Sequence, residues 1–447
     1  MNQEVVIIGG VAAGMSCAAK LSREDSEARI TVYEKGRHIS YGACGLPYYI
    51  GDVIEDHMKL VIKEPEDFED SNIDVKIMHQ VIKVLPEEKK VIVKNLETGD
   101  EFEKGYHKLV VATGAEPVKP PFVDEKVGNV FTLRTVEDGQ RIKEAAISDK
   151  VERVVLIGAG YIGLELVESF HNLGKQVALI NRSANIMKPV DQEIRDILLE
   201  ELKEKEIELN FNEEVERITQ GQDGMVKSVV TDKGEHPADL VVVAIGVAPA
   251  TRFLEGTGVD TLKNGAIVTN DRMETSVEDI YAAGDCATIY HRILKKDVHI
   301  PLATYANRQG RLLGEILAGK DSSFPGGIGA SVVKILDLTI SATGVNEKQA
   351  KDGGLEYETQ FIKGYSNAGY YPGSKPLYVK YIFEKDSKVL LGAQLAGEKG
   401  AQHRIDALSI AIQKGMTLRE LAYSDFAYTP PYSGAWDPLQ VAANVAE

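Results

Sequence analysis

One cysteine stands in a segment that favours redox chemistry. Cys44 lies within Ser40–Pro47, shortly after a candidate nucleotide-binding unit. Gly45 permits a tight turn and Pro47 suits the first turn of a helix, so we expect Cys44 at a helix N-terminus, where free N–H groups favour the thiolate. Where a C-x-x-x-x-C pair has its second sulfur, at 44 + 5 = 49, the chain has Tyr49. The Cys44 thiol is therefore predicted to pair with a sulfur from outside the protein.

The other cysteines do not point to a second reactive site. Cys17 falls on the apolar face of a predicted helix, and we expect both Cys17 and Cys286 to be small buried side chains. Three cysteines in 447 residues exclude a disulfide framework. Without a C-x-x-C motif or a Cys/His cluster, no metal centre is predicted.

Composition narrows the function classes. The net charge of 51 − 68 = −17 argues against binding to nucleic acid or to an anionic membrane, because both need concentrated lysine and arginine. No apolar run approaches the roughly 20 residues that span a bilayer. The first strand begins at Val5 without a basic and then apolar leader, so a cytoplasmic location is expected. The length predicts two to four domains.

The first candidate nucleotide-binding unit lies at the N-terminus. The apolar run Val5–Ile8 is typical of a buried parallel strand, and a glycine-rich turn, an alanine-rich helix and a second strand, Ile30–Tyr33, follow it. Glu34 lies 34 − 14 = 20 residues after Gly14, the separation at which a carboxylate meets ribose hydroxyls. The predicted contacts of the first dinucleotide are Gly9, Val11, Ala12, Ala13, Gly14, Glu34 and Lys35.

The same pattern recurs after 158 − 9 = 149 residues. Strand Val154–Ile157, a complete G-x-G-x-x-G fingerprint at Gly158–Gly163, a helix and strand Val177–Ile180 predict a second nucleotide site. Two such units are much more specific than one, because chance would have to supply strand, glycines and helix twice. The predicted contacts are Gly158, Gly160, Tyr161, Ile162, Gly163, Asn181 and Arg182.

Three further segments support a chain that passes twice between two nucleotide-binding domains. Leu109–Ala115 and Leu240–Gly246 are apolar strands that end in small residues, and each could return the chain across a domain junction. The segment Thr275–Asp285 brings an acid to a strand end, where it could bind a polyol. The additional predicted cofactor contacts are Ala112, Thr113, Gly114, Gly246, Gly284 and Asp285.

From about Gly326 the pattern changes to that of a separate α+β domain. Three β-rich segments, Ser331–Ile335, Leu377–Phe383 and Val389–Leu395, precede an amphipathic helix at Arg404–Lys414 and an aromatic, proline-containing tail. The predicted class is α/β, with two Rossmann-like domains and a C-terminal α+β domain. The expected boundaries are 1–116 with 248–325 for the first domain, 117–247 for the second and 326–447 for the third.

These motifs together resemble the two-dinucleotide-fold flavoprotein reductases, whose fold is that of glutathione reductase. The resemblance covers essentially the whole chain and implies bound FAD, NADPH or NADH as reductant, and a C-terminal dimerisation domain. The lone Cys44 resembles the branch of coenzyme A-disulfide reductases, NADH peroxidases, NADH oxidases and polysulfide reductases.

Two features separate the members of that branch. Peroxidases and oxidases usually carry a histidine two residues before the last fingerprint glycine, and this chain has Ala12. The segments Gly369–Gly373 and Ala427–Ser433 instead match the coenzyme A-disulfide reductase pattern, in which two tyrosines of the partner subunit reach the cysteine. They correspond to Tyr370 and Tyr428, and the resemblance thus implies a homodimer that takes a small-molecule thiol or disulfide.

The resemblance also implies a coenzyme A site. Lys20 and Arg23 match positions that meet the nucleotide phosphates, and Ser40 matches one on the pantetheine path. Position 43, often asparagine in that family, is Ala43, which removes an amide contact. Independently, Arg182 follows Asn181 where NADH enzymes usually have a carboxylate, so NADPH use, alone or beside NADH, is predicted.

The predicted reaction is reduction of coenzyme A disulfide, or of a related persulfide or polysulfide, through a mixed disulfide between Cys44 and coenzyme A. The alternative within enzymes is an NADH peroxidase or oxidase that uses a cysteine sulfenic acid. A third class is a non-catalytic flavoprotein that senses redox state through a partner; it would be reduced slowly and would turn over no small disulfide.

Overall fold

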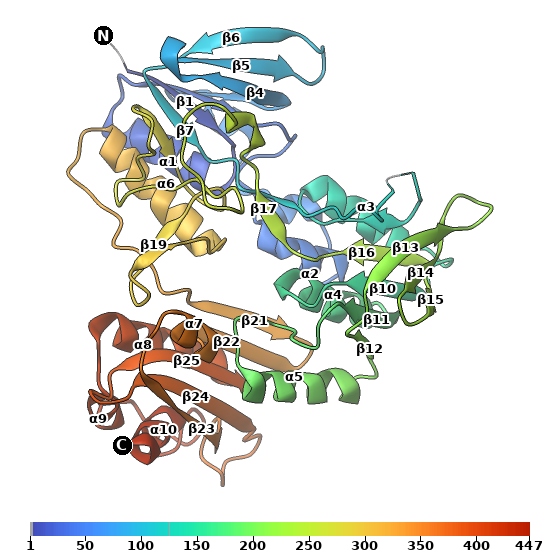
Figure 1. Cartoon of the computed structure of the whole chain (residues 1–447), viewed down its shortest axis with the longest axis vertical. Coiled ribbons are helices and arrows are strands. Elements are labelled where there is room, and N and C mark those ends of the chain that lie inside the picture. Colours follow the sequence, from blue (N-terminus) through green and yellow to red (C-terminus); the bar gives the residue numbers. More distant parts are fainter. Residues whose placement is uncertain (1–2, 125) are drawn as a thin grey trace.

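The computed structural model describes residues 3–124 and 126–447. Three sheets of five strands dominate it, two of them parallel and one antiparallel (Figure 1). The first parallel sheet has the strand order β18-β7-β1-β2-β3. Its strands are β1 (Glu4–Ile8), β2 (Arg29–Tyr33), β3 (Ile73–Lys76), β7 (Lys108–Val111) and β18 (Ile280–Ala282).

Two layers cover the faces of this first sheet. Helices α1 (Ala12–Glu24) and α6 (Ala303–Leu317) share a core with one face, which includes Ile7 and Leu21. The other face shares a core with a three-stranded antiparallel sheet of β4 (His79–Leu85), β5 (Lys90–Asn95) and β6 (Glu101–Gly105). Burial on both faces explains why the strands read as continuous apolar runs.

The second parallel sheet has the order β12-β11-β10-β16-β9. Its strands are β9 (Val130–Phe131), β10 (Arg153–Ile157), β11 (Gln176–Asn181), β12 (Glu208–Phe211) and β16 (Leu240–Val243). The helices of this region are α3 (Val136–Ala146), α4 (Tyr161–Asn172) and α5 (Gln192–Glu204). A three-stranded sheet adjoins it, formed by β13 (Val215–Gln220), β14 (Val226–Thr231) and β15 (Glu235–Pro237).

Short paired strands mark the passages between the regions. Strands β8 (Ala115–Pro117) and β17 (Val247–Pro249) pair in antiparallel fashion where the chain leaves the first region and returns to it (Figure 1). Strands β19 (Ile289–His291) and β20 (Lys296–Val298) form a hairpin before α6. Strand β8 begins at the end of the predicted segment Leu109–Ala115, and β17 follows the predicted segment Leu240–Gly246.

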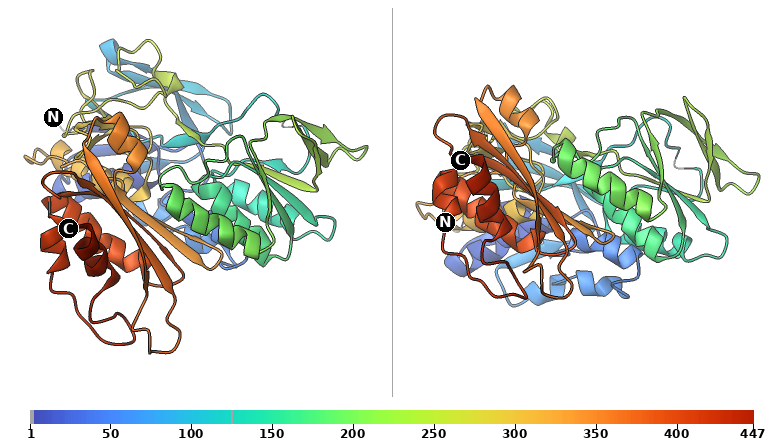
Figure 2. Two further views of the ribbon diagram at one scale, coloured as in Figure 1. Left: turned by 60° about the horizontal axis from the view of Figure 1, so that its bottom comes forward. Right: turned by 90° about the horizontal axis from the view of Figure 1, so that it is seen from below.

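The C-terminal region is an antiparallel sheet with helices (Figure 2). Its order is β21-β22-β25-β24-β23. The strands are β21 (Ser331–Ile335), β22 (Leu338–Gly344), β23 (Tyr357–Tyr365), β24 (Pro376–Glu384) and β25 (Leu390–Gly397). The helices are α7 (Glu347–Asp352), α8 (Ala401–Lys414), α9 (Leu418–Ala422) and α10 (Pro438–Ala446). The fold class predicted from the sequence is confirmed.

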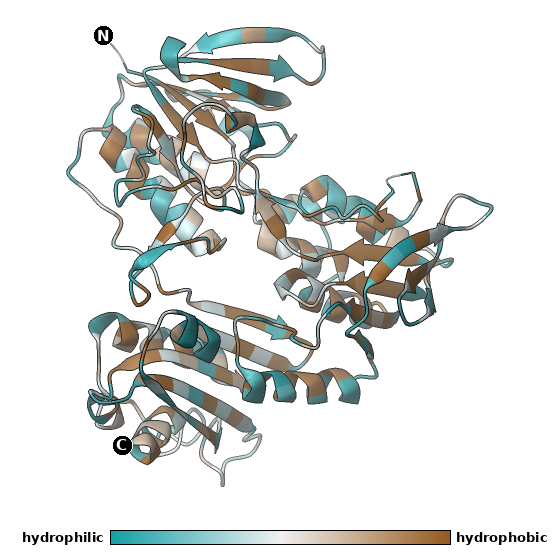
Figure 3. Ribbon diagram, viewed as in Figure 1, coloured by the Kyte–Doolittle hydropathy of each residue, from teal (hydrophilic) through white to brown (hydrophobic). Residues whose placement is uncertain are grey.

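Helix α5 shows how the pattern of the sequence becomes a face. Its side chains Ile194, Leu198 and Leu202 are buried and Ile197 is partly buried, which is the spacing of one face of a helix. Alternating apolar and polar bands along α5 are visible in Figure 3. Among the described residues, no helix combines the length and the low polarity that crossing a membrane requires.

Candidate active site

Cys44 stands at the start of a helix, as the sequence predicted. A single helical turn, Ala43–Gly45, runs directly into α2 (Leu46–Ile50), with Gly45 as the N-cap and Pro47 in the first turn. The Cys44 side chain is exposed, whereas Cys17 and Cys286 are buried as expected. Cys44 is therefore the cysteine that a ligand can reach.

The protein surroundings of Cys44 oppose thiolate formation, contrary to the expectation from the helix N-terminus. The surrounding protein removes water from part of the thiol, and this partial burial raises the pKa of Cys44. The negative charges of Glu165 and Asp285 raise it further. A backbone hydrogen bond acts in the opposite direction but is the smallest contribution. Burial is the largest cause of this departure from the expectation, and the two carboxylates, which come from distant parts of the chain, add to it.

Glu165 is a candidate site residue that the sequence reasoning missed. It lies on α4, which packs against α2: the Ser169 hydroxyl donates a hydrogen bond of 2.7 Å to the Pro47 carbonyl. Burial, and then the nearby Glu168, raise the pKa of Glu165 to about 7. The sequence could have indicated Glu165 by its position, one turn after Tyr161 on the helix that follows the second glycine fingerprint. That helix must face the other nucleotide-binding domain.

We expect Glu165→Gln to weaken the dependence of stability on pH. The folded pKa of Glu165, about 7, lies above its ordinary value of 4.5, so the wild type loses stability as pH rises through this window and the buried carboxyl ionises. Glutamine does not ionise, so the variant should gain about 2 kcal/mol relative to wild type across the window, with allowance for partial exposure. Urea unfolding at about pH 5 and about pH 8 measures the difference.

The control for this experiment is Glu200→Gln, which alters an exposed glutamate on α5. Its free energy of unfolding should follow that of the wild type at both pH values. Parallel pH profiles for wild type and Glu165→Gln would contradict the raised pKa.

The first glycine-rich segment forms a cradle at the N-terminus of α1. A Cβ added to Gly14 would lie 1.8 Å from the Gly9 carbonyl oxygen, so only glycine lets the helix approach the turn this closely. Val11 is the N-cap residue, and among the described residues no side chain caps the helix. Its first N–H groups can therefore bind an anion such as a pyrophosphate.

Glu34 and Lys35 are placed beside this cradle, but both have protein partners. The Glu34 carboxylate accepts hydrogen bonds of 2.7 Å from the backbone N–H groups of Gly10 and Gly36. Lys35 pairs with Glu116. Glu34 thus fixes the loop, and its remaining lone pairs can still accept from ribose hydroxyls.

The other predicted contacts of the first nucleotide gather at neighbouring strand ends. Ala112–Gly114 follows β7, and the Thr113 hydroxyl donates to the Ala250 carbonyl at 2.9 Å. Gly284 and Asp285 follow β18, which pairs with β7. Burial raises the pKa of Asp285, while the charges of Arg134 and His299 lower it.

The second glycine-rich segment repeats the first at α4. A Cβ on Gly163 would lie 2.0 Å from the Gly158 carbonyl oxygen, whereas a Cβ on Gly160 would meet no described atom within 4 Å. Gly160 is the N-cap, and the described residues supply no side-chain cap for α4. Ile162 lies in the first turn of α4, and the Tyr161 hydroxyl lies 2.8 Å from the Ser331 hydroxyl oxygen.

The end of β11 has no carboxylate. Asn181 accepts from the Ala159 N–H at 3.2 Å and donates to the Ser183 carbonyl at 2.6 Å, so its amide ties the fingerprint to the following loop. Arg182 and Lys188 lie in that loop with exposed side chains. Gly246, also predicted as a contact, follows β16 and accepts from the Val118 N–H at 3.0 Å.

The predicted anion site on α1 is only partly free. Lys20 is buried and pairs with Glu24 and with Glu315 of α6, so a phosphate would have to compete with two carboxylates for its ammonium group, and the phosphate contact stays a prediction. The sequence pattern could not show that α6 would place a carboxylate there. Arg23 is exposed, and Ser40 lies beside the first cradle, where its N–H donates to the Gly10 carbonyl at 2.9 Å.

Tyr370 and Tyr428 lie together although 58 residues separate them. Their hydroxyl oxygens are 2.9 Å apart, and the hydrogen bond to Tyr370 raises the pKa of Tyr428. The side chains are 76% and 47% exposed, so both can contact a partner.

Family models match almost the whole chain. Residues 3–310 match the model of the pyridine nucleotide-disulphide oxidoreductases, and residues 330–439 match the dimerisation domain of the same family. The chain belongs to this family. It is an oxidoreductase, and FAD and NAD(P)H are the cofactors of the family.

Two curated relatives span the chain. One is the coenzyme A disulfide reductase of Staphylococcus epidermidis, which is 35% identical to this chain over a match that covers 100% of both chains. The other is the NAD(P)H sulfur oxidoreductase (CoA-dependent) of Pyrococcus furiosus, 39% identical, with 99% of each chain covered. Full coverage at this identity fits the coenzyme A-disulfide reductase resemblance read from the motifs.

Solved structures are also similar to this chain over nearly its whole length. Reduced Bacillus anthracis CoADR-RHD has a TM-score of 0.95 at 36% identity, and the match covers all of this chain and 80% of that one. An engineered water-forming NADPH oxidase, a mutant of the Lactobacillus brevis NADH oxidase, has a TM-score of 0.94 at 31% identity, covering 99% of this chain and 98% of that one.

Proposed function

We propose that this flavoprotein reduces coenzyme A disulfide, or a closely related persulfide or polysulfide of coenzyme A, with NAD(P)H. The observation that carries the proposal is the exposed Cys44 at the start of α2, with Tyr49 where a second sulfur would stand. Because Cys17 and Cys286 are buried, the disulfide partner of Cys44 comes from the substrate. The full-length similarity to coenzyme A disulfide reductases favours coenzyme A as that partner.

The residues of the chain fit both cofactors. The uncapped N-terminus of α1 and the close approach of Gly14 to Gly9 leave room for the FAD pyrophosphate, with Glu34 and Asp285 placed for its hydroxyls. The uncapped α4, with open space at Gly160, fits the pyrophosphate of NAD(P)H. When bound, FAD passes the two electrons of NAD(P)H to sulfur.

Cys44 and the tyrosine pair perform the sulfur chemistry. Once the Cys44 thiol has lost its proton, its thiolate attacks one sulfur of coenzyme A disulfide, forms the mixed disulfide Cys44–S–S–CoA and releases one coenzyme A thiolate. Tyr428 of the other protomer, supported by the hydroxyl of Tyr370, donates a proton to that thiolate. Two electrons then cleave the mixed disulfide, release the second coenzyme A and restore Cys44.

Mass spectrometry and anaerobic turnover together test this proposal. The Cys44 peptide of untreated protein should carry an adduct of coenzyme A mass, and NAD(P)H should be consumed faster with coenzyme A disulfide than with peroxide. A sulfenic acid as the sole modification of Cys44, with faster consumption of peroxide or oxygen, would support the peroxidase and oxidase branch instead. Ala12, the first residue of α1, replaces the histidine usual in that branch.

The chain forms a homodimer through its dimerisation domain, and the exposed Tyr370 and Tyr428 complete the active site of the partner.

We place the FAD domain at 1–116 and 248–325, the NAD(P) domain at 117–247 and the dimerisation domain at 326–447. The pairing of β8 with β17 at the two crossings supports these boundaries. A cytoplasmic location fits a reductase of a coenzyme A compound.

NADPH is the favoured reductant. Asn181, Arg182 and Ser183 begin 181 − 163 = 18 residues after Gly163, and Lys188 follows five residues after Ser183. In the engineered NADPH oxidase, introduced alanine, arginine and serine residues begin 18 residues after a replaced glycine. A second introduced arginine follows five residues after that serine. The basic side chains of this chain therefore stand where engineering placed cations to create an NADPH enzyme.

We expect Arg182→Ala to raise the KM for NADPH about 10- to 100-fold, the cost of one charge-assisted contact to a phosphate. The KM for NADH should change little, because NADH has no 2′-phosphate. Steady-state kinetics with both nucleotides measures the ratio. Arg217→Ala, in β13 of the same region, is the control. Equal or better kinetics with NADH in both wild type and Arg182→Ala would contradict NADPH preference.

A further inference from the structure

The loop that carries Arg182 and Lys188 contacts two different parts of the molecule. This nucleotide loop, 182–190, joins β11 to α5. On one side, the N–H of the buried Met187 donates to the Ala159 carbonyl within the second fingerprint, at 3.0 Å. On the other side, the loop and the first residues of α5 meet the dimerisation domain.

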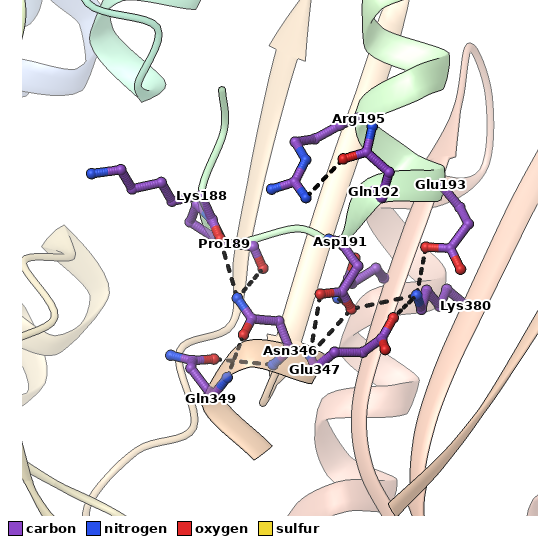
Figure 4. Close-up of polar contacts among 11 residues, drawn as sticks. Lys188, Pro189, Asp191, Gln192, Glu193, Arg195, Asn346, Glu347, Gln349 and Lys380 are labelled. Carbon is purple, nitrogen blue, oxygen red and sulfur yellow. Dashed lines mark hydrogen bonds and ion pairs between the residues drawn. The ribbon is translucent and has the colours of Figure 1, made fainter. Parts of the chain in front are cut away.

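The side chain of Asn346 binds the backbone of the nucleotide loop. Its amide nitrogen donates to the carbonyl oxygens of Lys188, at 3.1 Å, and Pro189, at 3.3 Å. The amide oxygen meanwhile caps α7 by accepting from the Gln349 N–H at 2.8 Å. Figure 4 shows the Lys188 side chain pointing away from these contacts, so its ammonium group stays available while its backbone is held.

Asp191, which follows the loop as the N-cap residue of α5, is held by hydrogen bonds from the dimerisation domain. Its N–H donates to the Gln394 side-chain oxygen, and the Gln394 amide nitrogen donates back to its carboxylate, both at 2.7 Å. The Glu347 N–H donates to the same carboxylate at 3.1 Å. Gln394 is 1% exposed and Asp191 7%, so these bonds are shielded from water.

A fully buried lysine completes the junction. Lys380 of β24 has no exposed surface and pairs with Glu193 and Glu347, and its ammonium nitrogen lies 3.7 Å from the Asp191 carboxylate (Figure 4). A buried cation among carboxylates from both sides of a domain boundary fixes geometry, because any separation would leave a charge buried without its partner.

We propose that Asn346, Gln394 and Lys380 are positioning residues for recognition of the nucleotide 2′-phosphate: the dimerisation domain holds the nucleotide loop in the conformation in which Arg182 and Lys188 meet the phosphate. The inference rests on the proposed use of NADPH. It places part of the nucleotide specificity outside the nucleotide-binding sheet, in residues that contact the backbone of the loop, Asp191 and Glu193.

Asn346→Asp tests the inference at the contact with the loop, and the uncharged variant Gln394→Met, described below, controls for the negative charge that aspartate adds. Aspartate keeps the acceptor that caps α7 but loses the donor to Lys188 and Pro189. Calorimetric titration of the purified FAD-loaded protein with adenosine 2′,5′-bisphosphate and with AMP should show about 10-fold weaker binding of the bisphosphate and nearly unchanged binding of AMP. The KM for NADPH should rise in parallel, while kcat and the KM for NADH stay close to wild type.

Two further variants keep the test decisive. Gln394→Met removes both hydrogen bonds to Asp191 at similar volume and should act in the same direction if Asn346→Asp does not fold. The control is Asp337→Asn, which breaks the ion pair between Lys205, the C-cap residue of α5, and the dimerisation domain away from the loop. It should leave both affinities unchanged.

The outcomes separate this inference from the proposal beneath it. Wild-type protein that binds the bisphosphate no more tightly than AMP would contradict NADPH preference itself. Wild-type protein that discriminates, with unchanged bisphosphate affinity in folded Asn346→Asp or Gln394→Met, would overturn the positioning role alone. An equal loss of both ligands would also overturn it, because the contacts would then support the whole nucleotide site rather than the phosphate.

Discussion

Cys44→Ser should reduce turnover of coenzyme A disulfide by at least about 1000-fold, the scale of loss when a covalent nucleophile is removed. A serine hydroxyl cannot form a mixed disulfide, and the buried Cys17 and Cys286 cannot replace the missing sulfur. The bound flavin should still accept electrons from NAD(P)H, because neither glycine-rich cradle contains Cys44. Anaerobic NADPH consumption and stopped-flow flavin absorbance measure the two steps separately.

The matched control for this experiment is Cys17→Ser, which changes the same atom at a buried position on α1. It should retain turnover, at some cost in stability. Substantial turnover in Cys44→Ser would remove the chemical basis of the proposed mechanism, whereas loss of flavin reduction in the same variant would indicate damage to the cofactor site rather than to the sulfur step.

Tyr428→Phe should slow turnover about 100-fold, within the usual contribution of a positioned general acid. In the proposed mechanism the phenol donates a proton to the departing coenzyme A thiolate, and its oxygen lies 2.9 Å from the hydroxyl oxygen of Tyr370. Tyr370→Phe should have a smaller effect, since it removes the supporting hydroxyl alone. The KM for NADPH should change little in either variant.

The control is Tyr423→Phe, another exposed tyrosine near the C-terminus, which should behave as wild type. Substrates with more acidic thiol leaving groups give a sharper test, because a thiolate that leaves without a proton needs no acid. Their turnover by Tyr428→Phe should approach that of the wild type. The same loss for every disulfide would mean that the tyrosine positions the substrate and does not protonate it.

Local patterns were sufficient to predict the two nucleotide-binding units. The strands at Val5–Ile8 and Val154–Ile157, the glycine turns after them and the buried face of α5 all depend on the periodicity of a short stretch of chain. The start of a helix at Cys44 was predictable for the same reason, since Gly45 and Pro47 act on their own backbone.

Contacts between distant segments were not predictable from such patterns. The pKa of Cys44 depends on burial and then on Glu165 and Asp285, and all three arise only after the domains assemble. The availability of Lys20 depends on Glu315, on a helix that the sequence reasoning did not identify. The contacts of Asn346 with the nucleotide loop join positions more than 150 residues apart and have no local signature.

In the proposed mechanism, the tyrosine loops of the C-terminal domain also couple catalysis to protein concentration. With the proton donor of each centre supplied by the other protomer, a separated subunit retains both nucleotide sites and its thiol yet lacks the acid. Dilution below the subunit dissociation constant should then abolish disulfide turnover while leaving the flavin reducible, so the association free energy enters the rate law directly.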